Sequence, residues 1–305
     1  MPRLPVPPAQ SHPPVARPLR AATTGMALGA LAYFLFALHD ALIKLLVGDG
    51  IPAWEVLMFR SAMIVGFCVT FGGQPVLRRA VATPIKRVLL LRASITLVAW
   101  LCYYSAARDL PLAQLLTLYF AAPLITTLLA VPLLRERVPL PRWASVALGF
   151  AGVVVACDPG GVPLSLATVL VLTAATFWGY TIILMRQTAM AESNLLLMLY
   201  TNSVFLVATT IGCAAVRWQT PTWTQLGLLL AVGAIGSLAQ LALFEGMRHA
   251  VASVMATVEY SALLWAFVLG FVIWGDIPRT EVFVGAGLIL AAGAVLLATE
   301  RRRSG

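Results

Sequence analysis

Apolar runs of close to twenty residues alternate along this chain with short polar segments. A transmembrane helix takes about 20 mainly apolar residues, because it must cross about 30 Å of hydrocarbon. The pattern predicts ten membrane-spanning helices, over residues 23–46, 54–72, 88–107, 111–134, 141–157, 165–186, 194–216, 223–247, 250–274 and 281–299. Residues 1–20 hold seven prolines and no apolar run, which predicts a disordered cytoplasmic tail, and residues 300–305 form a basic cytoplasmic tail.

Segments of the two halves of the chain align with each other without gaps. Residues 112–136 align with 252–276 at an offset of 140, and earlier positions such as Arg60 and Asn202 align at an offset of 142. The repeated unit holds five spans, over residues 21–157 and 165–299. Because five is odd, the second copy enters the bilayer upside down, as in the inverted repeats of secondary transporters. We therefore predict an all-α integral membrane protein of two inverted five-helix repeats.

Composition supports a membrane protein and excludes a sizeable soluble domain. Sixty percent of residues are hydrophobic, only 11% are charged, and the mean hydropathy is +0.91. About a quarter of residues are charged in an average soluble domain. Ten spans take up roughly 200 residues at about 20 residues each, which leaves only tails and short loops.

The net charge of +9 is interpreted as a signal that orients the protein in the membrane. With the N-terminus inside, sixteen Lys and Arg fall on the cytoplasmic side or at its helix ends: Arg3, Arg17, Arg20, Arg78, Arg79, Lys86, Arg87, Arg92, Arg135, Arg137, Arg142, Arg186, Arg248, Arg301, Arg302 and Arg303. The other side receives five: Lys44, Arg60, Arg108, Arg217 and Arg279. The positive-inside rule then predicts that both termini are cytoplasmic, in a multi-pass protein of the bacterial inner membrane, and disfavours nucleic acid as a partner.

With the spans placed, the chain resembles the EamA family of the drug/metabolite transporter superfamily over nearly its whole length after residue 20. The matching positions are Ala37 with Lys44, Gly179 with Arg186, Phe59-Arg60-Ser61, Pro123 with Arg135-Glu136-Arg137, and Tyr260 with Gly275-Asp276. Leu263 replaces the proline equivalent to Pro123, and the second repeat ends in Gly-Asp rather than Gly-Glu. The resemblance implies ten helices in two repeats, with a central cavity lined mainly by helices one to four and six to nine.

The resemblance also bears on the substrate, without choosing it. Residues 38–44, LHDALIK, are similar to the subset that includes bacterial riboflavin and S-adenosylmethionine importers. Aromatic amino-acid exporters belong to the same family. We therefore expect a small organic metabolite such as an amino acid, a flavin or a nucleoside-like compound, and the direction of transport stays open.

Charged residues inside the spans are the first site candidates, because each costs at least about 2.5–3.5 kcal/mol at mid-bilayer. Asp40 and Lys44 are spaced i,i+4 in the favourable order for a helical ion pair. They either anchor the first helix near the outer surface or, with His39 beside them, meet a charged substrate. Arg60 either reaches the outer interface or neutralises Asp40 or a substrate carboxylate.

Glu259 is the sharpest candidate, because it lies about nine residues into the ninth span with no basic residue at i±3 or i±4. It serves either as a proton-coupling site or as a neutral, hydrogen-bonded side chain that holds helices together. Its mate at the 140-residue offset is Tyr119, which is also polar within an apolar segment. Two polar positions related by the repeat favour a central site.

Aromatic side chains supply the remaining candidates. On the third span Thr96, Trp100, Tyr103 and Tyr104 share one helix face. They either pack against lipid near the interface or line the cavity and stack on a flat substrate. Further candidates on the second half are Trp178, Asn202, Gln240 and Tyr260.

The sequence contains no motif for catalysis, nucleotide hydrolysis, metal binding or an organic cofactor. GxxxxGK[ST] and HExxH are absent, and there are three histidines in all. The cysteines Cys68, Cys102, Cys157 and Cys213 form no CxxC pair and are interpreted as small buried apolar residues. The prediction is therefore a transporter rather than an enzyme. The alternatives are an intramembrane enzyme acting on a lipid and a non-transporting sensor or assembly protein.

Overall fold

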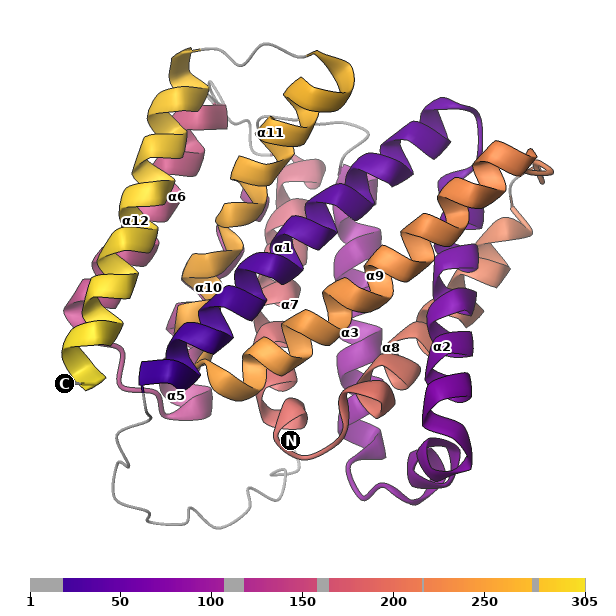
Figure 1. Cartoon of the computed structure of the whole chain (residues 1–305), viewed down its shortest axis with the longest axis horizontal. Helices are drawn as coiled ribbons and strands as arrows, with labels where there is room; N and C mark the ends of the chain where they lie inside the picture. Colours follow the sequence, from indigo (N-terminus) through magenta and orange to yellow (C-terminus); the bar gives the residue numbers. More distant parts are fainter. Residues whose placement is uncertain (1–18, 107–117, 158–164, 216, 276–279, 305) are drawn as a thin grey trace.

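The computed structural model describes residues 19–106, 118–157, 165–215, 217–275 and 280–304, and this part of the chain is helical throughout, without strands (Figure 1). The helices are α1 (Leu19–Gly48), α2 (Ala53–Ala82), α3 (Lys86–Ala106), α5 (Ala122–Leu134), α6 (Leu140–Cys157), α7 (Leu166–Ala189), α8 (Asn194–Cys213), α9 (Trp223–His249), α10 (Ala252–Glu259), α11 (Ser261–Trp274) and α12 (Thr280–Ser304). The predicted tail at residues 1–20 lies almost wholly outside the described residues.

Six of the described helical segments are long and apolar enough to cross a membrane: 23–48, 53–82, 166–189, 194–213, 223–249 and 252–274. Shorter apolar helices cover 122–134, 140–155 and 280–296. The chain is thus a multi-pass membrane protein, and the predicted class of ten helices in two inverted repeats is confirmed.

Two spans differ from the sequence prediction. Instead of ending at Gly72-Gly73, α2 kinks at Gly73, where φ is +53°, and continues past Pro75 to Ala82. The residues 74–82 after the kink, here called the α2 extension, carry Arg78 and Arg79, which lie between the second and third predicted spans. The ninth span breaks at Tyr260 into α10 and α11. The backbone N–H of Tyr260 donates to the carbonyls of Thr257 and Val258, which interrupts the regular hydrogen bonding of the helix.

Helix packing follows the repeat. The helices α1, α2, α3, α5 and α6 correspond in order to α7, α8, α9, α10 with α11, and α12. α1 lies along α9 and α3 lies along α7, while α2 pairs with α8 and α6 with α12 (Figure 1). Exchanging the two halves converts the first pair into the second and maps the other two pairs onto themselves. The halves therefore pack as equivalent units, and their main contacts run between them.

The first turn of α1 and the last turn of α12 lie on the same face of the bundle, at the bottom of Figure 1. We call this the terminal face. The ends of α2, α7 and α9 also lie there, as do the starts of α3 and α8. Most of the described polar links between the halves lie on this face.

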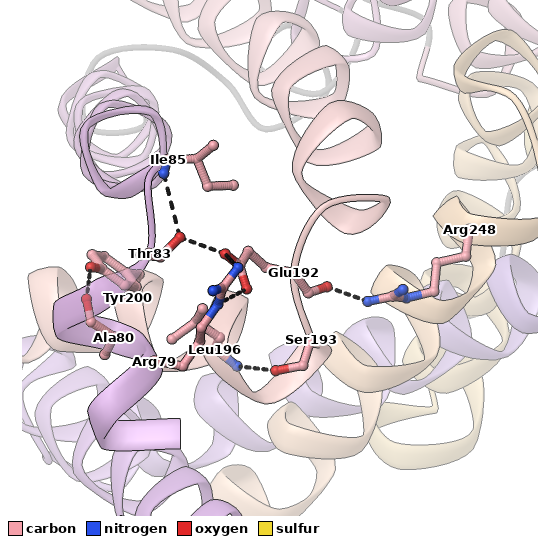
Figure 2. Close-up of polar contacts among 9 residues, drawn as sticks. All are labelled: Arg79, Ala80, Thr83, Ile85, Glu192, Ser193, Leu196, Tyr200 and Arg248. Atoms are coloured by element: carbon pink, nitrogen blue, oxygen red, sulfur yellow. Dashed lines mark hydrogen bonds and ion pairs between the residues drawn. The ribbon is translucent and has the colours of Figure 1, made fainter. Parts of the chain in front are cut away.

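The central link on the terminal face is Glu192, in the turn between α7 and α8 (Figure 2). Arg79 Nε and Nη2 donate to its two carboxylate oxygens at 2.9 and 2.7 Å, and the Thr83 hydroxyl donates to one of them at 2.5 Å. Arg248 from the end of α9 donates to the Glu192 carbonyl. The Tyr200 hydroxyl donates to the carbonyl of Ala80 at 2.6 Å. The α2 extension is thereby fastened to the second repeat.

Candidate substrate site

A cavity of about 60 Å³ lies between the two halves of the bundle. Its walls come from α1, α2, α3, α7, α8 and α9, and are formed by Phe36, Arg60, Arg92, Thr96, Trp100, Trp178, Met185, Thr201, Asn202, Phe205, Gln240, Leu243 and Phe244. The structure thus brings five predicted candidates, Arg60, Trp100, Trp178, Asn202 and Gln240, to one cavity.

Several wall residues are counterparts in the repeat. Phe36 with Trp178 and Arg60 with Asn202 are 142 positions apart, and Trp100 with Gln240 are 140 apart. These are the two offsets at which the halves align. At these three pairs of positions the two halves present equivalent residues to the cavity, as expected when a site lies on the pseudo-twofold axis of an inverted repeat.

Arg60 is buried in the cavity wall, at 4% exposure, rather than extended to an interface. Its guanidinium carbon lies 5.7 Å from the centroid of the Trp100 ring. A small residue on α9 makes room for it. A Cβ added to Gly236 would lie 3.2 Å from Arg60 Nε and 3.3 Å from His39 Cδ2. His39 therefore reaches the back of the Arg60 site, although it does not line the cavity itself.

Asn202 and Gln240 form a polar pair across the cavity wall. Asn202 Nδ2 donates to Gln240 Oε1 at 2.9 Å and to the Met198 carbonyl at 2.9 Å. Both side chains are buried. A carboxamide pair in an otherwise aromatic wall offers hydrogen bonds to a polar substrate group, and it fixes α8 against α9.

Glu259 lies directly behind the cavity wall at the end of α10, with 4% exposure. The indole nitrogen of Trp178, which lines the cavity, donates to Glu259 Oε1 at 2.6 Å. The other carboxyl oxygen has no hydrogen-bond partner in the described part, and neither has the buried Tyr33 hydroxyl on α1. Glu259 is thus coupled to the cavity through a single side chain.

Asp40 and Lys44 each contact another residue in place of the predicted ion pair with each other. Asp40 Oδ1 lies 2.9 Å from Nδ1 of the preceding residue, His39, and its own side chain is exposed. Lys44 Nζ instead sits 4.0 Å from the ring centroid of Trp274 on α11. The aromatic partner attracts the ammonium group while leaving it at the bundle surface, so neither residue lines the cavity.

Three tyrosine candidates pack away from the cavity. Tyr103 and Tyr119 meet edge to face with their ring centroids 4.8 Å apart. Tyr260 is fully buried among α5, α6 and α12, stacked on Phe120. The side chain of Tyr104 lies outside the described residues. The predicted face of α3 is therefore divided, with Thr96 and Trp100 in the cavity wall and Tyr103 outside it.

Sequence reasoning missed Arg92 and Thr201 as members of the wall. Arg92 entered the sequence prediction only as a cytoplasmic charge near the start of the third span. The structure buries its side chain to 1% exposure. Its position six residues after Lys86, about one and two thirds helical turns into α3, was the available signal.

The model of the EamA-like transporter family matches residues 23–157 and 165–298. An S-adenosylmethionine uptake transporter of Rickettsia bellii is 26% identical, with 89% of this chain and 94% of that protein covered. The pseudopaline exporter CntI of Pseudomonas aeruginosa is 25% identical, with 91% and 97% covered. A riboflavin transporter of Vibrio cholerae is 26% identical, with 84% and 86% covered.

A solved structure described only as a crystal structure of a protein matches with a TM-score of 0.74 at 18% identity. The match covers 93% of this chain and 99% of that one. At this identity the likeness supports the fold alone.

Proposed function

The chain belongs to the EamA-like transporter family, and from this membership and the cavity we propose that it is a secondary carrier working by alternating access. It moves a small organic metabolite across the bacterial inner membrane. Three relatives carry such compounds, namely S-adenosylmethionine, pseudopaline and riboflavin. Because one of them is an exporter and another an uptake transporter, the family likeness leaves the direction open.

The observation that carries the proposal is the convergence of repeat-related side chains on one cavity. Arg60 and Asn202 reach it from opposite halves, and so do Trp100 and Gln240. A site shared by two inverted halves stays in place while one half rocks against the other, so that it opens to each side in turn.

In this proposal the terminal face is cytoplasmic, as the distribution of Lys and Arg predicts. The contacts of Glu192 with Arg79 and Thr83 then close the cytoplasmic side, since they fasten the α2 extension to the α7–α8 turn. Opening toward the cytoplasm requires that these contacts separate.

Glu259 is proposed as the proton-coupling residue. It is buried, and it is linked to the cavity wall by the hydrogen bond from Trp178. A carboxyl group in that position changes its charge when it takes up or releases a proton. The Trp178 indole transmits this change to the substrate site, because its Nε1–H binds a carboxylate more strongly than a neutral acid.

The test uses purified protein in liposomes loaded with and exposed to S-adenosylmethionine, riboflavin or an aromatic amino acid. We expect labelled substrate to exchange across the membrane, and an imposed proton gradient to drive net accumulation. Glu259→Gln should abolish gradient-driven accumulation while exchange continues. Equal loss of both activities would assign Glu259 to substrate binding, and unchanged accumulation would remove it from the mechanism.

A further inference from the structure

Arg92 on α3 is a buried cation in the cavity wall whose protein partners are all neutral. Its Nη2 donates to the carbonyl of Leu197 at 3.0 Å and to the hydroxyl of Thr201 at 2.7 Å. The Phe244 ring lies 5.1 Å from its guanidinium carbon. No described carboxylate forms an ion pair with it. Nε is buried without any acceptor.

These partners do not balance the charge. Burying an ion costs more than a single net hydrogen bond or a cation–π contact returns. A guanidinium has five N–H donors, and the two bonds made here both use Nη2. The N–H groups on Nε and Nη1 have no acceptor in the described part of the protein.

The charge of the whole wall has the same sign. Arg60 and Arg92 are the only residues with a formal charge among the thirteen described side chains that line the cavity, and none of the thirteen is Asp or Glu. Glu259 lies behind Trp178 and is not among the described wall residues. Five of the other eleven described wall residues are aromatic, among them Phe36, Trp100 and Trp178.

We propose that Arg92 is the anchor for an oxyanion of the substrate, and that this cavity takes small organic anions with a flat or apolar body. A carboxylate or phosphate group accepts hydrogen bonds from the guanidinium, while the body of the molecule lies against the aromatic rings. The inference rests on the proposed function only in calling the bound molecule a substrate. The preference of the cavity for anions is a property of the folded protein.

The test measures that preference without knowledge of the substrate. Thr96, one turn after Arg92 in the cavity wall, is replaced by cysteine in a variant freed of the four native cysteines. The purified protein reacts with anionic 2-sulfonatoethyl or cationic 2-(trimethylammonium)ethyl methanethiosulfonate. Each rate is divided by that of a cysteine at the exposed residue Asp49. We expect the anionic reagent to react faster in the cavity.

Variants at Arg92 assign the preference to this side chain. Arg92→Gln should lower the ratio of anionic to cationic rates by on the order of tenfold or more, since a full charge within a few ångströms is removed, and Arg92→Lys should keep it. Arg92→Met, which leaves no donors to satisfy, replaces the glutamine variant if that one does not fold. Faster reaction of the cationic reagent, a ratio unchanged by the loss of Arg92, or no reaction with either reagent would overturn the proposal.

The failure of the anion-site proposal and the failure of the proposed carrier function can be told apart by this experiment and the liposome test. A cavity that prefers anions in a protein that moves no substrate would leave the anion site standing and remove the carrier function. Transport by a cavity that prefers cations would do the reverse.

Discussion

At the scale of single residues, the site depends on a small side chain as much as on charged ones. Gly236 on α9 faces Arg60 and His39 so closely that an added Cβ would lie 3.2 and 3.3 Å from them. Gly227, on the same helix, has no atom within 4 Å of the position of an added Cβ. These two glycines form a matched pair for mutagenesis.

We expect Gly236→Ala to lower substrate exchange in liposomes several-fold, because the new methyl group displaces Arg60 or His39. Overpacking costs typically 1–3 kcal/mol, so the melting temperature of the Gly236→Ala variant should also fall. Gly227→Ala should keep both exchange and stability, with a gain of up to about 1 kcal/mol from helix propensity. Equal behaviour of the two variants would show that Gly236 has no special place beside Arg60.

Some residues of the site could be predicted from the sequence, and others could not. Arg60, Trp100 and Glu259 were predicted as candidates because polar or aromatic groups in apolar spans are costly or distinctive. The burial of Arg92 was not predicted, since charge counting alone does not tell an interfacial arginine from one that faces a cavity. In a bilayer both the lipid and the protein interior are apolar, so the usual helical periodicity of polar residues does not mark which face is buried.

At the scale of elements, the α2 extension was not predicted as helix from the sequence, yet it makes polar contacts with the second repeat. The sequence predicted that the second span ends at residue 72, but the chain only kinks at Gly73 and carries Arg79 to Glu192. Burial alone raises the pKa of the Glu192 carboxyl. The hydrogen bonds from Arg79 and Thr83 and the charge of Arg79 outweigh burial, so its pKa lies below the ordinary value.

The sign of this shift predicts a pH dependence. A carboxyl whose pKa is lowered by folding contributes stability that is complete above its unfolded pKa, about 4.3, and is lost as the pH falls through the folded value. Glu192→Gln should therefore melt below the wild type at pH 7, and the difference should shrink toward pH 3–4. Glu281→Gln, at an exposed acid in the first turn of α12, is the control. A difference that grows on acidification would contradict the assignment.

Helices α6 and α12 also pack closely against each other. An added Cβ at Gly152 would lie 2.8 Å from the carbonyl oxygen of Gly285 and 2.9 Å from Ile289 Cγ1. A backbone atom cannot turn aside as a side chain does, so Gly152→Ala must push the helices apart. We expect a loss of about 1–3 kcal/mol in the free energy of unfolding.

Gly287 on α12 provides the comparison, since nothing lies within 4 Å of its added Cβ. Gly287→Ala should leave the fraction of monodisperse protein after heating unchanged, whereas Gly152→Ala should lower it. Because neither residue is near the cavity wall, exchange per folded molecule should stay the same in both variants. A selective loss of exchange in Gly152→Ala would mean that this contact moves during transport.

At the scale of the whole molecule, the fold was the most predictable feature. Hydropathy located the spans because lipid imposes one length on all of them, and the odd number of spans in each repeat fixed the inversion. The break of the ninth span at Tyr260 was not predicted, since no proline or glycine marks that position. Inversion also requires that equivalent loops of the two repeats lie on opposite sides of the membrane.

Asp49, between α1 and α2, and Ala191, between α7 and α8, are 142 positions apart and therefore equivalent in the two repeats. Both are exposed. In an inverted repeat they must nevertheless lie on opposite sides of the membrane. In a cysteine-free background, a membrane-impermeant maleimide should label Asp49→Cys in intact spheroplasts, and Ala191→Cys only after permeabilisation. Tags at both termini should behave like Ala191→Cys, because the terminal face is proposed to be cytoplasmic. Labelling of the two cysteines from the same side would contradict the inversion, whereas the opposite assignment of both would keep the inversion and reverse the protein in the membrane.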